Sequence, residues 1–452
     1  MKFLQFSTLT FGIVFILFSL TLGRAFGDFG WSFPRLVGMG IGVLLVLFNR
    51  KMLAWVERRR RLVSILNQIA LFIWTILIAS LLLEVGARVY LQFNADARIK
   101  TVEQFRASRP APFRDAPYYS ETFLKEWGVF ASGAGWTTPS GTRLMIPVDY
   151  QGQYINTANG RRRTTGQPPT AKRTVHVVGG STTFAAEVPD PYTIPSQLQL
   201  LLNKKFGDIY RVENLGAVTV TVAQQIELLK TIRLKEGDVV IFYDGVNDIT
   251  QSLMNGNPRG WIVGDNRRVF ADLNSLQKAK LNLYNVFGGQ SEFATLFLYP
   301  YEIQPAPAHL NDPARVEQLK TELDRIYYEG VLEAAQLAQV SGVEFYHFLQ
   351  PNLFTSSPMT DYEKKLAAKK FIIYPGMQEA FTIGNPVLRN TTKRLAADGI
   401  KSLDISDVLN ERPNGEEFYL DHCHVTHIAN ERIAEAIFKR LFMNVKAIDI
   451  PK

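Results

Sequence analysis

A serine with two threonines behind it closes one apolar stretch of the chain, "VHVVGGSTTFA" at 175–185. The β-branched run before it predicts a strand, and the pair Gly179 and Gly180 predicts a turn too tight for side chains. Ser181 would then lie where a sheet meets the next element, a position suited to a nucleophile. Such a turn is also common where no chemistry occurs, and a serine without an adjacent base is a poor nucleophile. A catalytic role for Ser181 therefore depends on partners elsewhere in the chain.

The elements that would position Ser181 alternate regularly between strand and helix after about residue 170. Strands are predicted at 174–180, 210–216 and 238–245, with helices between them. Further along, a long helix precedes a strand at 343–351, and a short strand at 401–406 precedes the closing helix. Continuous apolar strands that alternate with helices predict a parallel sheet covered on both faces. The predicted fold class is therefore a three-layer α/β domain.

Polar residues follow several of these strands at the point where each strand ends. Asn214 and Gly216 close the second strand, and Asn247 follows the third. Just before the closing helix, "YLDHCHVTH" contains Asp421 and, three residues later, His424. Ligands of open α/β sheets bind beyond the carboxyl ends of the strands, so we expect these side chains to lie near Ser181.

This ordered set resembles the SGNH hydrolase superfamily, also called GDSL esterases and lipases, over about residues 174–442. The resemblance implies a flavodoxin-like three-layer fold and a hydrolase of carboxylic esters. It implies that Ser181 is the nucleophile and that Asp421 and His424 complete its catalytic triad. It also implies an oxyanion hole formed by the backbone amides of Ser181 and Gly216 and the side chain of Asn247. No cofactor and no metal are expected.

Two positions depart from the family pattern. Gly180 stands where many members have aspartate, and Ala429 stands where a glycine is frequent. Neither departure removes a reacting group. The chemistry itself needs these residue types, because the attacking serine must give its proton to a base and histidine has the ordinary pKa nearest neutrality. An aspartate orients that histidine, and each hydrogen bond to the developing oxyanion is worth about 10²- to 10³-fold in rate.

Other readings of the same residues remain open. The cluster at 421–427 could instead bind zinc, although ligands so crowded along the chain rarely all face one ion. His347 and His176 are expected to be structural strand histidines, and Gln350 and Asn352 are either substrate contacts or ordinary loop residues. A non-catalytic envelope assembly or polysaccharide-binding module would keep the same fold without chemistry.

The region before about residue 92 is far more apolar than the rest and contains three candidate membrane spans, at 3–22, 36–48 and 63–83. About 20 apolar residues in a helix match the hydrocarbon thickness of a bilayer. The second stretch is short, so two spans are the alternative count. The first could be a signal peptide, but the residues after it lack a convincing cleavage site.

The loop at 50–61 carries most of the positive charge near these spans and predicts the orientation of the chain. Basic loops stay in the cytoplasm, so three spans would place everything after about residue 90 outside it. We therefore expect a multi-pass protein of the bacterial cytoplasmic membrane with a periplasmic catalytic domain. The net charge of +8 includes this loop, and so indicates no nucleic-acid partner.

The expected organisation has three parts: a membrane anchor at 1–91, a linker or entry subdomain at 92–170, and a catalytic domain at 171–452 with an insertion at about 250–315. An ester site held near a membrane suits O-acyl groups, such as acetyl, on a cell-envelope polysaccharide. The same triad would serve an O-acetyltransferase that receives acyl groups from a partner protein of envelope biosynthesis. Both reactions pass through a seryl ester.

Overall fold

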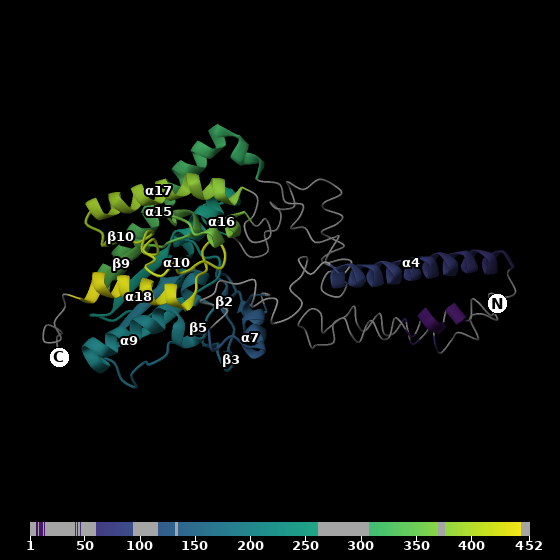
Figure 1. Cartoon of the computed structure of the whole chain (residues 1–452), viewed down its shortest axis with the longest axis horizontal. Helices are drawn as coiled ribbons and strands as arrows, with labels where there is room; N and C mark the ends of the chain where they lie inside the picture. The colour runs from purple at the N-terminus through teal and green to yellow at the C-terminus, as the bar shows by residue number, and fades with distance from the viewer. Residues whose placement is uncertain are drawn as a thin grey trace. The chain divides into compact units, whose positions relative to one another are not determined.

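The computed structural model describes residues 60–93, 116–131, 134–260, 307–368 and 376–443, together with isolated positions among the first 46 (Figure 1). The chain divides into two compact units. One contains Met1–Arg98 and Leu273–Glu302, and the other contains Ile99–Asp272 and Ile303–Lys452.

The first unit contains one long apolar helix, α4 (Arg60–Phe93). Its stretch Val63–Val89 is long and apolar enough to cross a membrane, with a mean hydropathy of 2.3. Large apolar side chains such as Leu71, Phe72 and Leu82 are exposed along it. The predicted third span lies inside α4, whereas the predicted first and second spans fall mostly outside the described residues. At one of the described early positions, Ser7 accepts a hydrogen bond of 3.0 Å from the Trp74 indole.

The second unit is built on a sheet whose central strands are parallel. These strands, in spatial order, are β10 (Ser402–Asp404), β9 (Glu344–Leu349), β8 (Val239–Asp244), β6 (Arg173–Gly179) and β7 (Tyr210–Gly216). The chain therefore starts in the middle of the sheet at β6, adds β7 on one side, and then adds β8, β9 and β10 on the other. This is the flavodoxin-like order, in which the direction of winding reverses between β6 and β8.

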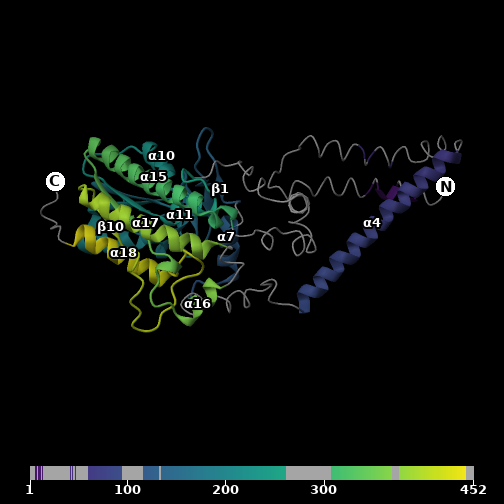
Figure 2. The same ribbon diagram turned by 90° about the horizontal axis from the view of Figure 1, so that it is seen from above.

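Helices cover both faces of this sheet, which confirms the predicted three-layer α/β fold (Figure 1). On one face, α9 (Ile194–Phe206) packs against α18 (His427–Phe442). On the other face lie α10 (Val222–Lys230), α15 (Pro313–Val340) and α17 (Met377–Ala397), and Figure 2 shows α15 and α17 side by side. The strands are buried between the layers, so they need the continuous apolar sequence from which they were predicted.

Short elements connect these layers. They are α8 (Ser181–Phe184), η2 (Asp190–Tyr192), η3 (Gly207–Ile209), α11 (Val246–Ile249), the π-helix η4 (Thr250–Met254), η6 (Ala308–Asn311), η7 (Leu353–Thr355) and α16 (Asp361–Ala367). Most of the predicted insertion at about 250–315 lies outside the described residues.

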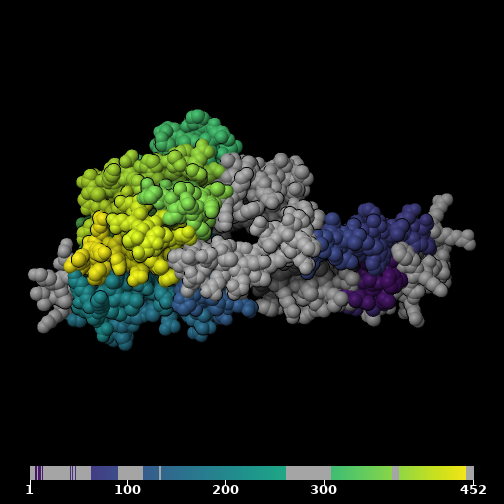
Figure 3. Space-filling view, in the orientation of Figure 1, coloured from purple at the N-terminus to yellow at the C-terminus, as the bar shows by residue number. Residues whose placement is uncertain are grey.

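Residues before β6 enlarge the sheet. Three antiparallel strands extend it beyond β7: β5 (Arg161–Arg162), β4 (Asn156–Ala158) and β3 (Tyr150–Gln151). We call these three strands the sheet extension. Next to it lie α7 (Glu121–Ala131) and a hairpin of β1 (Trp136–Thr137) and β2 (Ile146–Pro147). In Figure 3 the blue segment that carries these elements joins the teal surface of the α/β domain.

One buried carboxylate links α7 to the sheet extension. Glu126 accepts hydrogen bonds from the backbone amides of Gln153, Tyr154 and Ile155, at 2.7, 2.9 and 2.9 Å. Several N–H donors compensate a buried carboxylate for the water that it loses. This segment, expected to be a linker or entry subdomain, therefore contributes strands and a buried polar contact to the domain.

Candidate active site

Ser181 is the first residue of α8 and directly follows the turn that ends β6. Neighbouring atoms leave no room for a side chain at either of the two glycines before Ser181. A β-carbon on Gly179 would lie 2.1 Å from Thr183 Oγ1 and 2.6 Å from the Tyr243 carbonyl oxygen, and one on Gly180 would lie 2.6 Å from Asn247 Nδ2. An aspartate at position 180 would therefore displace the Asn247 side chain. The glycine pair allows the strand, Asn247 and the turn at 179–181 to approach closely. We call this turn the nucleophile turn, after the role expected of Ser181.

The structure brings Ser181, His424 and Asp421 into one hydrogen-bonded chain. Ser181 Oγ lies 2.9 Å from His424 Nε2, and His424 Nδ1 lies 2.6 Å from Asp421 Oδ2. The other carboxylate oxygen, Oδ1, accepts the backbone amides of Cys423 and His424 at 2.8 and 2.7 Å. The loop before α18 thus folds around Asp421 and presents the imidazole to the nucleophile turn. Ser181 and His424 come from segments 243 residues apart in sequence.

The charges of the triad support one another. Burial alone would raise the pKa of the Asp421 carboxyl, but the charge and hydrogen bond of His424, with help from His422 and the Cys423 amide, hold it well below its ordinary value. Burial alone would lower the pKa of His424, but Asp421, Cys423 and Glu187 raise it well above its ordinary value. Asp421 therefore favours the protonated form of His424, and the positive charge of that form keeps Asp421 ionised.

Asn247, in α11, lies beside the nucleophile turn. Its Nδ2 donates a hydrogen bond of 3.0 Å to the Val220 carbonyl oxygen and lies 2.6 Å from where a β-carbon on Gly180 would be. A primary amide carries two N–H donors, so one remains for a substrate oxygen. The Ser181 amide is the first of α8 and has no acceptor within that helix. One donor belongs to Ser181 itself, and the other lies beside the residue before it, Gly180.

The backbone amide of Gly216, which is expected in the oxyanion hole, has an acceptor within the protein. This amide donates a hydrogen bond of 3.0 Å to the Asn214 side chain, whose amide in turn donates to the Thr183 carbonyl oxygen at 3.1 Å. The glycine itself is explained by packing, because a β-carbon there would lie 2.2 Å from the Phe184 backbone nitrogen. Gly216 therefore allows β7 to pass close to α8.

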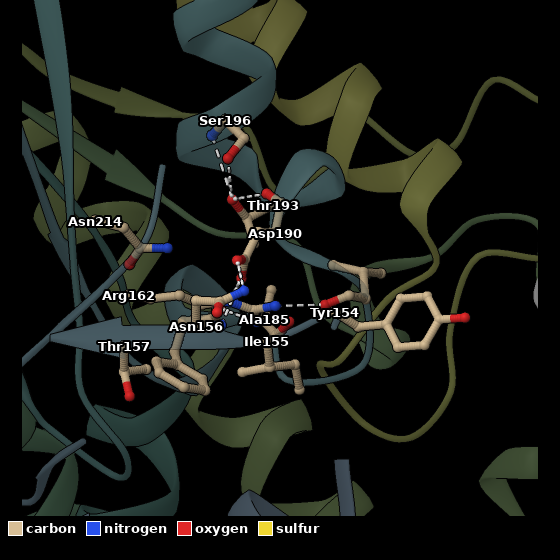
Figure 4. Close-up of polar contacts among 12 residues, drawn as sticks. Tyr154, Ile155, Asn156, Thr157, Arg162, Ala185, Asp190, Thr193, Ser196 and Asn214 are labelled. Carbon is tan, nitrogen blue, oxygen red and sulfur yellow. Dashed lines mark hydrogen bonds and ion pairs between the residues drawn. The ribbon is translucent and has the colours of Figure 1, made fainter. Parts of the chain in front are cut away.

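A buried arginine, missed in the sequence, holds the loop that follows α8 (Figure 4). Arg162 extends from β5 and donates to the carbonyl oxygens of Phe184, Ala185 and Val188, and its Nε lies 3.1 Å from Asp190 Oδ1. Asp190 also accepts the Asn156 side chain at 2.9 Å. The planar guanidinium presents donors in a rigid fork, which suits several acceptors at once. The sheet extension thus positions the loop at 184–190, which follows Ser181 and which we call the nucleophile loop.

Glu187 is a second residue that sequence patterns did not indicate. It lies in the loop held by Arg162, and its Oε1 is 4.0 Å from His424 Nε2, on the side of the imidazole that faces Ser181. A carboxylate at this distance favours the protonated imidazole. Its position in an irregular loop carries no periodicity, and no motif pointed to it.

The remaining candidates have structural partners. His347 is fully buried, with Nδ1 2.6 Å from Ser402 Oγ and Nε2 2.8 Å from the Tyr327 hydroxyl, as expected for a structural strand histidine. His176 is buried beside Asp238, at 3.4 Å. Gln350 accepts the Thr182 hydroxyl at 3.1 Å, and Asn352 caps η7.

The five residues weighed as zinc ligands do not converge. Asp421, His422 and Cys423 place one ligand atom each within 4.8 Å of one another. His424, however, points toward Ser181, and His427 Nδ1 lies 3.1 Å from the Tyr118 hydroxyl. Asp421 already engages His424 and two backbone amides, so the arrangement among these residues fits a triad better than a four-ligand zinc site.

Comparisons with known proteins show similarity to solved structures only. No family model and no curated protein matches the chain. A member of the lipolytic protein G-D-S-L family from Veillonella parvula is 12% identical, with a TM-score of 0.34, covering 60% of this chain and 100% of its own. An acetyl xylan esterase, AlAXEase, is 12% identical, with a TM-score of 0.33 and the same coverage.

A putative arylesterase from Agrobacterium tumefaciens is 16% identical, with a TM-score of 0.31, covering 62% of this chain and 100% of its own. At these scores the likeness is too distant to transfer a function, so the site geometry must support any proposal. The chain is similar in structure to a G-D-S-L family protein and to esterases, the group of enzymes that its motifs resemble.

Proposed function

We propose that the protein is a serine esterase anchored in a membrane, which removes O-acyl groups from a cell-envelope polysaccharide outside the cytoplasm. The observation that carries the esterase activity is the hydrogen-bonded chain from Ser181 Oγ through His424 to Asp421, at 2.9 and 2.6 Å. It lies at the carboxyl ends of β6 and β8, where the winding of the sheet reverses and ligands of such folds bind.

The residues supply each step of ester hydrolysis. His424 takes the proton of Ser181 as its oxygen attacks the acyl carbon, and Asp421 stabilises the imidazolium that forms. The free N–H of Asn247 and the Ser181 amide stabilise the oxyanion. The leaving alcohol departs with the proton from His424, which leaves an acyl ester on Ser181. His424 then takes a proton from water, whose oxygen releases the acid and restores Ser181.

The proposed location rests on α4 and on the charge of the preceding loop. The exposed apolar side chains of α4 fit a lipid environment, and the basic residues at 50–61 fit the cytoplasmic side. A triad in a domain next to a membrane has access to polymers of the cell envelope. Acyl esters on polysaccharide hydroxyls are the substrate class that combines this location with this chemistry.

Labelling with a fluorophosphonate tests the esterase proposal directly. The full chain, purified in detergent, is reacted with the probe and assayed with p-nitrophenyl acetate as wild type, Ser181→Ala and His424→Ala. We expect labelling and hydrolysis in the wild type and neither in Ser181→Ala, because only an activated serine reacts.

Ser402→Ala is the matched control. Ser402 also contacts a histidine, His347, but it is buried in the edge strand β10, so its loss should leave labelling unchanged. A folded wild-type chain that is neither labelled nor active would contradict the proposal, and the same would follow if Ser181→Ala kept the label.

A further inference from the structure

A cavity of about 420 Å³ opens on the sheet extension and is separate from the residues of the triad. Six of its lining residues define what we call the basic pocket: Arg161, Arg163, Thr164, Gln167, Arg211 and Glu213. They come from β5, from the residues after it and from β7. Nothing in the proposed ester chemistry uses them.

The basic pocket has more positive than negative charge. Arg161 and Arg211 share one carboxylate, that of Glu213, at 3.0 and 2.8 Å. Arg163 is exposed and forms no ion pair with any residue that the structure describes. Apart from Arg162, which is paired with Asp190, the lining therefore carries three arginines and one carboxylate. Arginine forks bind carboxylates and phosphates through paired hydrogen bonds, so this arrangement suits an anionic group.

The pocket also offers hydrogen bonds that the protein does not use. Thr164 is 4% exposed, and its hydroxyl has no hydrogen-bond partner. Buried hydroxyls without a partner are rare, because the loss of water is uncompensated. Gln167 is held in place by a bond of 2.6 Å from its Nε2 to the Val212 carbonyl oxygen. A ligand with both hydroxyls and a negative charge would match these groups.

Strand β5 connects the basic pocket to the active site. Arg161 and Arg163 flank Arg162 in sequence, and whereas Arg162 is buried, Arg161 is partly exposed and Arg163 is exposed. Arg162 holds the loop from Phe184 to Asp190 that follows the nucleophile. A polymer bound by the outer arginines would thus be held on the same strand that positions the Ser181 loop.

We infer that the basic pocket binds an acidic sugar residue of the polysaccharide whose esters are cleaved at Ser181, with the arginines on its anionic group and Thr164 and Gln167 on its hydroxyls. This inference rests on the proposed esterase function for the identity of the polymer. It predicts that the enzyme prefers an acidic, acylated polysaccharide to a neutral one.

The test compares three substrates with the full chain in detergent: p-nitrophenyl acetate, acetylated xylan and acetylated polygalacturonate. Arg163→Gln is the test variant. The Arg163 side chain is exposed and forms no ion pair among the described residues, so the loss of its charge should not disturb the fold. Arg440→Gln, an exposed arginine of α18 outside the pocket, is the matched control. We expect Arg163→Gln to raise the KM for acetylated polygalacturonate by roughly 3- to 30-fold, as the loss of a charged hydrogen bond would.

In the same variant, hydrolysis of p-nitrophenyl acetate should be unchanged, and acetylated xylan should remain a poorer substrate. Equal activity on the acidic and neutral polymers, or equal effects of Arg163→Gln and Arg440→Gln, would overturn the inference while hydrolysis of the small ester still supported the esterase. Absence of labelling and of small-ester hydrolysis would instead contradict the proposed function.

Binding without turnover gives a second, independent readout. Two proteins, the Ser181→Ala variant and the double variant Ser181→Ala with Arg163→Gln, are each titrated with de-esterified polygalacturonate, a neutral glucan and a polyglycerol phosphate. Binding of either anionic polymer that weakens in Arg163→Gln and with added salt supports an anion site, and the stronger of the two identifies the anion as carboxylate or phosphate. Equal binding of the neutral glucan would overturn it.

Discussion

At the scale of single residues, Asp421 is expected to act through His424 rather than on the substrate. Asp421→Asn would keep the shape of the side chain but favour the wrong tautomer of His424 and lose the charge that stabilises the imidazolium. We expect kcat for p-nitrophenyl acetate to fall by about 10³- to 10⁴-fold with little change in KM. Steady-state kinetics of the full chain measure both constants.

The conservative variant Asp407→Asn, which changes a carboxylate outside the site, should show wild-type kinetics. A loss of less than about tenfold in Asp421→Asn would mean that the backbone amides of the 421–424 loop, rather than the carboxylate, hold His424 in position.

Glu187 should tune the pH at which His424 works. The pKa of His424 is lowered by burial but raised more strongly by Asp421, Cys423 and Glu187, with His422 nearby. Activity needs neutral His424 as the base, so it appears as pH rises through this pKa. Glu187→Gln removes one negative charge, lowers the pKa of His424 and should shift the acidic limb of the kcat/KM profile to lower pH.

The profile of Glu435→Gln, a surface carboxylate of α18, serves as the reference. If the acidic limb of Glu187→Gln coincides with that reference, or moves to higher pH, the carboxylate does not act on the imidazole across the 4.0 Å gap.

Residue types and spacing predicted that Ser181, Asp421 and His424 would lie together, because the expected chemistry requires them and two of them lie on one short loop, and the structure joins them by hydrogen bonds. They did not predict the bond from the Gly216 amide to Asn214, since a glycine that donates to an oxyanion and one that makes room for a neighbouring backbone look alike in sequence. Glu187 and Arg162 gave no signal. Their roles depend on which distant groups the fold brings next to them.

At the scale of elements, the buried strands were the most predictable. The stretches 174–180, 210–216 and 238–245 correspond closely to β6, β7 and β8, because a strand covered on both faces needs an unbroken apolar run. The sheet extension was not foreseen. Its strands are only two or three residues long and polar, and they form because β5 pairs with the exposed edge of β7.

Arg162 should therefore matter to both stability and activity. Arg162→Lys keeps the charge, but an ammonium cannot reach Asp190 and several carbonyl oxygens at once. Disturbing a buried ion pair costs about 3 kcal/mol, which corresponds to a fall of roughly 5–10 °C in the unfolding midpoint of a domain of this size. Thermal unfolding of the full chain in detergent measures the shift.

Arg161→Lys on the same strand is the control, since its partly exposed pair with Glu213 is worth little. Equal midpoints for the two variants would show that the Arg162 contacts do not hold the nucleophile loop.

At the scale of the whole molecule, the chain combines α4, a helix long and apolar enough to cross a membrane, with an α/β unit that has a buried apolar core. Most exposed side chains of α4 are apolar, whereas most apolar side chains of the α/β unit are buried between its layers. This contrast explains why composition alone separated the two regions near residue 92. Hydropathy does not say on which side of the membrane the α/β unit lies, and only the basic loop at 50–61 bears on that question.

The orientation leads to the last prediction. If the basic loop is cytoplasmic and α4 crosses the membrane, alkaline phosphatase fused after Lys452 should be active, because that enzyme matures only outside the cytoplasm, and a fluorescent protein fused there should be dark. Fusions within the loop at 50–61 should show the reverse. Replacing Arg58, Arg59, Arg60 and Arg61 by glutamine should weaken this asymmetry. An inactive phosphatase after Lys452, in a chain that remains in the membrane fraction, would place the triad in the cytoplasm and remove envelope polysaccharide from its reach.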